Sequence, residues 1–444
     1  MDPWRMIENL VRPKFLFGEE RSERAPQNDD AGDLSGGENG GRALGVTRRD
    51  VTASLKGPAL AQIGAAVPTV IFGVAAVSVP LATAQAYALT DGQTASMIFG
   101  LYGIPGVLCL LVARIYRQPL LIAWHIHGLV FITALSVQYT YAQVLGGLVV
   151  AGALVFLLGA LRLSTRIASL IPTPIVFGIV AGTAMPFVVR VFDEMSLYPL
   201  LIGATVGAYV ASQRLLSAQI PPILPALIVG GAMAALLGDI GGFPRAWSPP
   251  VPELILPAFS WQAILSIAPV MAVFIGLQSN LTTSIYLRSQ GYDPPDRLTN
   301  VLTGAGTSLG AILGATPISS GSAVIALVAG PDAGEHRSRF WTIYLVGAGW
   351  LIVAFGATIV ATLPSLVPLS LLFALAGIVL LGVLHQALQE VTRGPLRFGP
   401  VFAFVIASSE LSLFGLGALF WALVIGMAAT LILEPESYSA TRSE

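Results

Sequence analysis

The stretch Pro119-Leu120-Leu121-Ile122-Ala123-Trp124-His125-Ile126-His127-Gly128 decides the fold of this chain. It belongs to an apolar span that is short for a membrane crossing, and it opens with proline, carries two histidines and closes with glycine. We therefore expect residues 119–126 to be extended and a half-helix to start near Gly128. In lipid, each backbone group that no helix satisfies costs several kcal/mol, so such a stretch must face protein or a water-filled cavity.

A second broken stretch, Gly314-Ala315-Thr316-Pro317-Ile318-Ser319-Ser320-Gly321-Ser322, lies in the other half of the chain. The half-helix after each break would direct its N-terminus, with a partial positive charge, toward the membrane centre. Such an end binds anions readily. Two broken spans are typical of a transporter rather than of a simple helical bundle.

The composition around these stretches is that of a membrane protein. Of 444 residues, 55% are hydrophobic and 11% are charged, against about 25% charged in a soluble domain. A soluble enzyme is excluded as the default, and a net charge of -1 gives no basic face for nucleic acid. With the single Cys109 and four histidines, we expect neither a metal site nor a cofactor. Apolar spans are expected near 61–86, 94–113, 119–135, 142–160, 167–188, 197–212, 221–238, 263–286, 298–313, 318–330, 340–361, 369–388, 398–412 and 414–433.

Arginines in the loops predict the orientation of these fourteen spans. The outer loops would carry only Arg190 and Arg245, and the excess of arginine would lie inside. Both termini are therefore predicted to be cytoplasmic, in a cell membrane such as a bacterial inner membrane. The inner loops would carry Arg114, Arg117, Arg162, Arg166, Arg214, Arg288, Arg297, Arg337, Arg339, Arg393 and Arg397.

The two broken spans are each third of seven, which predicts two inverted repeats. The fold class expected is an all-α polytopic membrane protein with repeats at 57–238 and 263–433. An extracytoplasmic linker would cover 239–262. We expect a disordered cytoplasmic tail over 1–56, where polar and charged residues predominate, and a short cytoplasmic tail over 434–444.

His125 and His127 are the first candidate site residues. They are two positions apart, so on an extended strand they would face the same side. Ionisable side chains at membrane depth are functional candidates, here for proton coupling or for binding a carboxylate. The alternative is a neutral histidine bonded to a backbone carbonyl, with a structural role only. A zinc site is not expected, because no further ligands are evident.

Small hydroxyl residues mark the second broken span. Thr316, Ser319 and Ser320 could cap its half-helix or bind a ligand, and the two roles are compatible.

Span eight ends in Gln278-Ser279-Asn280-Leu281-Thr282-Thr283-Ser284, a polar run that we expect to face protein or water instead of lipid. It could line a cavity or join helices by hydrogen bonds. Gln278 and Asn280 are the best cavity candidates, and Gln85, at the end of span one, is a weaker one.

Several short motifs together resemble the benzoate:proton symporter family of the BenE type, over roughly residues 57–433. The family is similar to nucleobase transporters and sulfate permeases. The resemblance implies fourteen spans in two inverted repeats, with a core domain, a gate domain and two short strands meeting near the membrane centre. The matching motifs are Gln93-Thr94-Ala95-Ser96, Tyr116-Arg117-Gln118-Pro119, Ala123-Trp124 with Gly128, Arg166, Ile171-Pro172, Ala181-Gly182, Asn280-Leu281, Leu287-Arg288, Gly291-Tyr292 and Gly330-Pro331-Asp332.

The chain departs from the family pattern at the expected substrate site. His125-Ile126-His127 replaces a typical Ser-Thr-Pro, and Gly314 to Ser319 replaces a typical Gly-Gly-His-Ala-Ile-Asn. Thr282-Thr283 stands where a Pro-Gly pair usually follows Asn-Leu. The family's histidine in span ten is thus lost, and two histidines are present in span three.

The function predicted is a proton-coupled importer of a small organic anion, with an aromatic carboxylate such as benzoate as the best candidate. The half-helix N-termini, including Gly128, would hold the carboxylate, Gln278 and Asn280 would add hydrogen bonds, and His125 or His127 would take the proton. The partners expected are this anion, protons and the lipid bilayer, and relatives of the fold imply a homodimer.

Four alternatives remain at this stage. An inorganic-anion permease or a nucleobase carrier could share the fold, although nucleobase carriers generally use acidic residues in spans eight and ten. A membrane-embedded enzyme would need a nucleophile and base, such as His125 with Ser319, and no supporting motif is present. A purely structural or receptor role would leave the costly broken spans unexplained.

Overall fold

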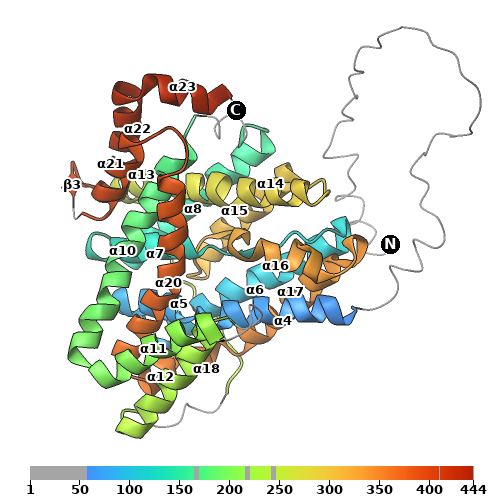
Figure 1. Cartoon of the computed structure of the whole chain (residues 1–444), viewed down its shortest axis with the longest axis vertical. Coiled ribbons are helices and arrows are strands. Elements are labelled where there is room, and N and C mark those ends of the chain that lie inside the picture. Colours follow the sequence, from blue (N-terminus) through green and yellow to red (C-terminus); the bar gives the residue numbers. More distant parts are fainter. Residues whose placement is uncertain (1–57, 165–169, 216–220, 242–246, 410, 444) are drawn as a thin grey trace, which may run out of the picture. The chain divides into compact units, whose positions relative to one another are not determined.

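The computed structural model describes residues 58–164, 170–215, 221–241, 247–409 and 411–443, all within one compact unit of the chain. The expected tail over 1–56 lies outside these residues, as do Arg166 and Arg245. Within the described ranges, helices occupy every stretch where an apolar span is expected (Figure 1).

The first half of the described chain runs from α4 to α12. The helix breaks between α4 and α5 within the first span, and β1 precedes α7 within the third. The elements are α4 Leu60–Ala75, α5 Ser78–Ala86, α6 Asp91–Tyr116, β1 Ile122–Trp124, α7 Ile126–Ala134, η1 Leu135–Val137, α8 Tyr141–Ala160, α10 Thr173–Leu197, α11 Pro199–Leu215 and α12 Ile223–Leu237.

The second half repeats this order of elements, with β2 standing where β1 stands in the first half. The elements are α13 Trp261–Val273, the π-helix η2 Phe274–Leu281, α14 Thr282–Ser289, α15 Asp296–Ile312, β2 Ile318–Ser320, η3 Ser322–Val324, α16 Ile325–Ala329, η4 Pro331–Ala333, η5 His336–Ser338, α17 Phe340–Phe355, α18 Ala357–Ala361, α19 Leu363–Leu366, α20 Leu369–Val391, α21 Phe398–Ala407, β3 Ser412–Leu413, β4 Leu416–Gly417, α22 Ala418–Leu433 and α23 Pro435–Ser443.

Seven helical segments in the described ranges are long and apolar enough to cross a membrane. Four shorter apolar helices, of 10–17 residues, accompany them. Two of the long helices begin at capping boxes. The Thr90 and Thr140 hydroxyls accept the backbone N–H of Gln93 and Gln143, and each glutamine side chain accepts the threonine N–H in return.

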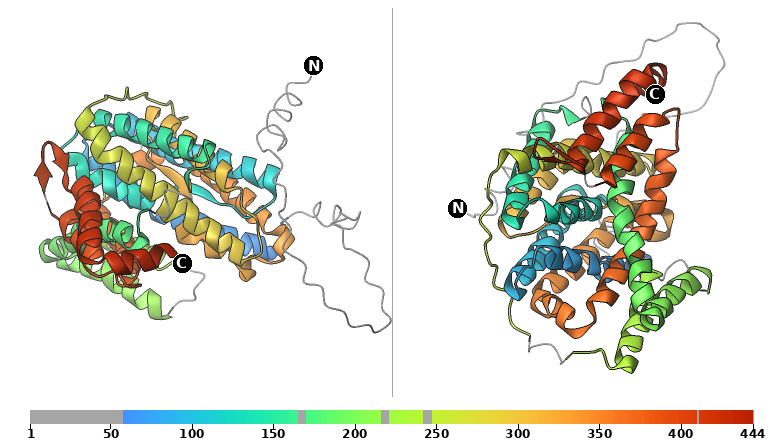
Figure 2. Two further views of the ribbon diagram at one scale, coloured as in Figure 1. Left: turned by 90° about the horizontal axis from the view of Figure 1, so that it is seen from above. Right: turned by 90° about the vertical axis from the view of Figure 1, so that its left-hand side faces the viewer.

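The helices form two groups, and each group draws on both halves of the chain. In one group α8 packs on α13 and α15, and α6 packs on α17. In the other, α10 packs on α20 and α21 (Figure 1). Residues 247–260 connect the halves as an irregular segment along the edge of the helices (Figure 2). The exact domain boundaries stay predictions.

The two broken spans meet in an antiparallel pair of three-residue strands. Ile122 pairs with Ser320, and Trp124 with Ile318. Beyond the strands, the His125 N–H donates to the Pro317 carbonyl at 2.8 Å, and the Gly321 N–H donates to the Leu121 carbonyl at 2.9 Å. These bonds satisfy backbone groups that the breaks leave free, so each broken span stabilises the other.

The paired strand β1 covers only the middle of the expected stretch 119–126, and α7 begins at Ile126 rather than near Gly128. The two histidines therefore do not share one side of a strand, as their spacing would have allowed. His125 is the N-cap of α7, and His127 lies in its first turn. The physical reason is the His125 side chain itself, which accepts the Gly128 N–H and so starts the helix earlier.

Candidate functional site

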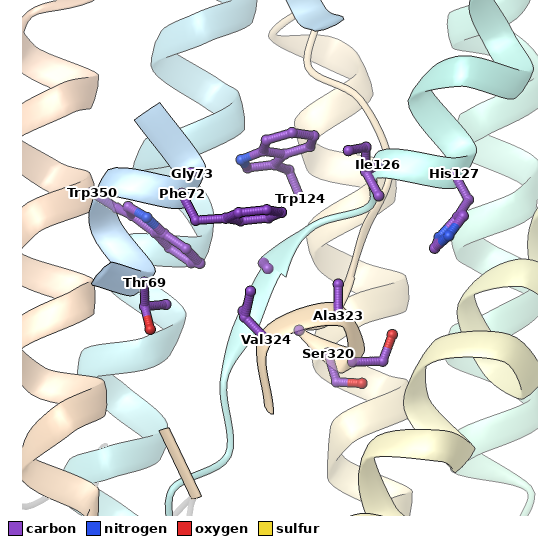
Figure 3. A pocket seen from close by; sticks show the side chains of 13 residues that line it. Thr69, Phe72, Gly73, Trp124, Ile126, His127, Ser320, Ala323, Val324 and Trp350 are labelled. Carbon is purple, nitrogen blue, oxygen red and sulfur yellow. The ribbon is translucent and has the colours of Figure 1, made fainter. Parts of the chain in front are cut away.

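A small cavity lies beside the strand pair and is lined by both broken spans and two further helices (Figure 3). Its volume is about 50 Å³, enough for several water molecules. Most of the lining is apolar, with His127 as its one ionisable side chain among the described residues. The lining residues are Thr69, Phe72, Gly73, Ala123, Trp124, Ile126, His127, Ser320, Gly321, Ser322, Ala323, Val324 and Trp350.

His125 is buried behind this cavity with both ring nitrogens engaged. Its Nδ1 accepts the Gly128 N–H at 2.9 Å, and its Nε2 lies 2.8 Å from the Gln278 side-chain oxygen. A nitrogen that accepts an N–H carries no proton, so the proton of the neutral ring lies on Nε2 and is donated to Gln278. Protonating Nδ1 would break the cap of α7. This geometry favours a structural role for His125, with a backbone N–H and a side-chain amide as partners instead of the backbone carbonyl considered from the sequence.

His127 has a different environment, although its ring centroid lies only 5.3 Å from that of His125. The side chain is 3% exposed and lines the cavity. In the described part of the chain, neither of its ring nitrogens has a hydrogen-bond partner. His127 is therefore the member of the pair that is free to exchange a proton or bind an anion.

The end of span eight is a π-helix, η2, that holds the two broken spans together. Gln278 in η2 contacts His125 of the first break. Ser279 reaches the second break, where its hydroxyl donates to the Ser320 carbonyl and lies 2.9 Å from the Ser319 hydroxyl. Isolated π-helical turns occur frequently at functional sites.

Asn280 uses its amide fully within the protein. Its Oδ1 accepts the Ser320 N–H at 2.9 Å, and its Nδ2 lies within hydrogen-bond distance of Asn300 Oδ1 and Thr303 Oγ1. It joins spans eight, nine and ten and does not line the cavity. This arrangement favours the helix-joining alternative over ligand binding for Asn280.

The remaining candidates are distributed unevenly around the cavity. Ser320 lines it and bonds to Thr283 at 2.8 Å, whereas Ser319 lies behind it. Thr316 is fully buried with an unpartnered hydroxyl, outside the cavity lining. A Cβ on Gly128 would lie 2.8 Å from His125 Nδ1, so glycine permits the cap. Gln85 is exposed at the end of α5, away from the cavity.

No sequence pattern pointed to the residues that α4 and α17 add to the cavity. These are Thr69, Phe72 and Gly73 from α4, and Trp350 from α17. Phe72, Trp124 and Trp350 give the cavity three aromatic side chains. Their aromatic side chains were a weak indication of a site, because an aromatic residue in a membrane span more often packs in the core or lies at the lipid interface.

The chain belongs to the BenE family of benzoate membrane transport proteins. The family match covers residues 57–432. The inner membrane protein YdcO of Escherichia coli K12 is 26% identical over 380 residues, covering 82% of this chain and 96% of that protein. The benzoate membrane transport protein of Acinetobacter baylyi is 26% identical over 322 residues, covering 72% of this chain and 81% of that protein.

A solved structure confirms the fold class. The transmembrane domain of the cyanobacterial bicarbonate transporter BicA matches with a TM-score of 0.54 at 16% identity, covering 82% of this chain and 97% of that one. The predicted fold of two inverted repeats and the resemblance to the BenE family are therefore both correct. The chain is a multi-pass membrane transport protein and not an enzyme.

Proposed function

We propose that this protein is a proton-coupled importer of a small aromatic carboxylate. The observation that carries the proposal is the position of His127. Its ring has no hydrogen-bond partner in the described chain, and it lines a cavity where two broken spans cross beside three aromatic side chains. The membership in the BenE family supports the same substrate class.

The carboxylate would lie at the His127 end of the cavity. In a helix, the first N–H groups have no partner within the helix. In the nine-residue helix α7, His125 satisfies the Gly128 N–H, which leaves the N–H groups of Ile126 and His127 for a ligand. These donors and the positive end of the helix dipole favour an anion.

The aromatic ring would lie against Phe72, Trp124 and Trp350. Aromatic pairs contribute about 0.5–1.5 kcal/mol beyond the apolar area that they bury. Apolar walls with a few polar groups at one end are typical of small-molecule sites. An inorganic anion would gain nothing from these rings.

The proton would travel on His127. An imidazolium beside the carboxylate forms an ion pair, whereas a neutral ring offers one hydrogen bond only. Binding of the anion would therefore take up a proton and tighten as the pH falls. His125 does not suit this role, because protonating its Nδ1 would remove the cap of α7.

Alternating access would come from movement between the two helix groups. The group that contains α6, α8, α13, α15 and α17 also holds α5 and α7. It meets the group of α10, α20 and α21 where α7 packs on α10 and α5 packs on α20. Movement at these contacts would carry the cavity from one membrane face to the other.

The proposal also places both termini in the cytoplasm and treats the protein as a homodimer.

Ligand-dependent thermal unfolding of the purified protein in detergent tests the substrate class. The panel comprises benzoate, aliphatic carboxylates, nucleobases and inorganic anions at two pH values. A ligand at one hundred times its Kd stabilises the native state by about 2.7 kcal/mol. We expect stabilisation by benzoate, and more of it at the lower pH. Stabilisation by bicarbonate, sulfate or nucleobases alone would contradict the proposal.

Titration calorimetry in buffers of different ionisation enthalpy tests the proton. We expect benzoate binding to the wild-type protein to take up a proton, and the uptake to disappear in His127→Gln. Proton uptake that persists in this variant would show that another group carries the proton.

A further inference from the structure

The indole N–H of Trp350 is a buried hydrogen-bond donor without an acceptor. The side chain is 2% exposed, and its Nε1 has no partner. A buried donor left unsatisfied costs about 1–3 kcal/mol. Native proteins retain few such groups, so this one calls for an explanation.

Trp350 lines the cavity on the side away from His127 (Figure 3). Its neighbour across the helix contact is Gly73 of α4. A Cβ added to Gly73 would lie 3.1 Å from Trp350 Nε1. Glycine at this position therefore places no side chain, and no side-chain acceptor, against the nitrogen-bearing edge of the indole.

We infer that the transported acid carries a second, neutral hydrogen-bond acceptor opposite its carboxylate, and that Trp350 recognises it. This inference rests on the proposed function. A ligand that extends from His127 to Trp350 presents its carboxylate at one end and its far substituent at the other. The described lining has no charged group near Trp350, so a second carboxylate would be buried without a counter-charge. A neutral oxygen, such as a ring hydroxyl, satisfies the N–H without that cost.

The unpaired donor also makes Trp350 a specificity-determining residue. A site built to hydrogen-bond a polar group disfavours the analogue that lacks it, because the site's own polar group then stays unpaired. An aromatic acid with a methyl group at the far position should bind less well than one with a hydroxyl group of similar size.

The experiment compares two pairs of ligands by calorimetry on the full-length protein in detergent. The pairs are 4-hydroxybenzoate with 4-methylbenzoate, and 4-methoxybenzoate with 4-ethylbenzoate. The methoxy oxygen of the second pair can accept a hydrogen bond but cannot donate one, so this pair excludes an effect of the hydroxyl group as a donor. In each pair we expect the oxygen-bearing ligand to bind more tightly. A neutral hydrogen bond corresponds to a factor of about 2 to 12 in affinity.

Trp350→Phe keeps an aromatic ring and removes the N–H. In this variant the preference within each pair should fall by about 2- to 12-fold. Trp341→Phe is the matched control, because Trp341 lies on the same helix α17 outside the cavity lining. The control should keep the wild-type preference.

The outcomes separate this inference from the proposed function. If benzoate binds but neither pair shows a preference, or if the preference persists in Trp350→Phe, the inference about Trp350 is wrong and the proposed function stands. If no aromatic carboxylate binds the wild-type protein, both fail. Should Trp350→Phe not fold, the wild-type ligand pairs alone decide, and tighter binding of the oxygen-free ligands overturns the inference.

Discussion

The two broken spans have the same topology but different chemistry. The first continues into the nine-residue helix α7, which a histidine caps and whose first turn carries the free His127. The second continues into η3 and the five-residue α16, and its strand is held by Ser279 and Asn280 of η2. In the proposed function the first break therefore binds the ligand, whereas the hydroxyl and amide groups around the second break bond to one another and to its backbone.

The last carbonyl group of the short α16 also finds its partner in a side chain outside the helix. Buried Arg339 donates from Nε to the Gly334 carbonyl at 2.9 Å and from its terminal nitrogen to the Ala329 carbonyl at 2.7 Å. A cation at a helix C-terminus satisfies carbonyls that the helix leaves free. The comparison teaches that an inverted repeat conserves the path of the chain, while each copy satisfies its backbone groups by its own side chains.

Of the substitutions that test this comparison, Asn280→Ala is expected to have the largest effect, a loss of stability. The substitution removes three hydrogen bonds, one from the β2 backbone at Ser320 and two that join span eight to span nine. At about 1 kcal/mol each, the loss amounts to roughly 3 kcal/mol of stability. Thermal unfolding in detergent measures it. Ser284→Ala, a buried residue of the adjoining α14, is the control and should cost far less. Equal destabilisation by both variants would argue against a supporting network.

His127→Gln is expected to have the next largest effect, on ligand binding rather than on stability. Losing the ion pair should weaken benzoate binding at low pH by about tenfold, or roughly 1.4 kcal/mol. The melting temperature without ligand should change little, because the ring makes no hydrogen bond in the described structure. Binding isotherms at two pH values measure the effect. Unchanged affinity at the lower pH would show that His127 of the first break does not bind the carboxylate.

His125→Ala should lower stability by about 1 kcal/mol, the usual cost of losing an N-cap. His125→Asn sharpens the test, because asparagine can accept the Gly128 N–H in place of the histidine ring. We expect thermal unfolding to show a loss for alanine and a partial recovery for asparagine. If asparagine is no better than alanine, the cap of α7 does not depend on this hydrogen bond.

Ser320→Ala should have the smallest effect. Its hydroxyl lines the cavity but is already bonded to Thr283. We expect a loss of about 1 kcal/mol in stability and less than a threefold change in benzoate affinity. A larger loss of affinity for Ser320→Ala than for His127→Gln would show that the second break, and not the first, makes the main contacts to the ligand.

Much of the fold could be predicted from local sequence. Apolar runs long enough for a bilayer mark the spans, and Pro119 and Pro317 mark the breaks, because proline cannot continue a helix at these points. His127 is predicted as a site residue for the same kind of reason, since ionisable side chains at membrane depth are functional candidates.

The site was harder to predict, because it depends on which spans meet. His125 and His127 are equivalent candidates in the sequence, and only the hydrogen bonds of His125 to Gly128 and Gln278 distinguish them. Asn280 was expected in the cavity for its polarity, yet its partners are Asn300, Thr303 and the Ser320 backbone. A polar residue in a membrane span must find a partner, and polarity alone does not tell which one.

The sequence by itself determined that this chain spans the membrane, where its helices break and that the two halves share one plan. These features follow from the cost of exposing backbone groups to lipid, which acts on each segment separately. Only the tertiary structure decided the register of β1 with β2, the different hydrogen-bond environments of the two histidines, and the approach of Gly73 and Trp350 to the cavity. These depend on contacts between segments far apart in the chain, which no local pattern records.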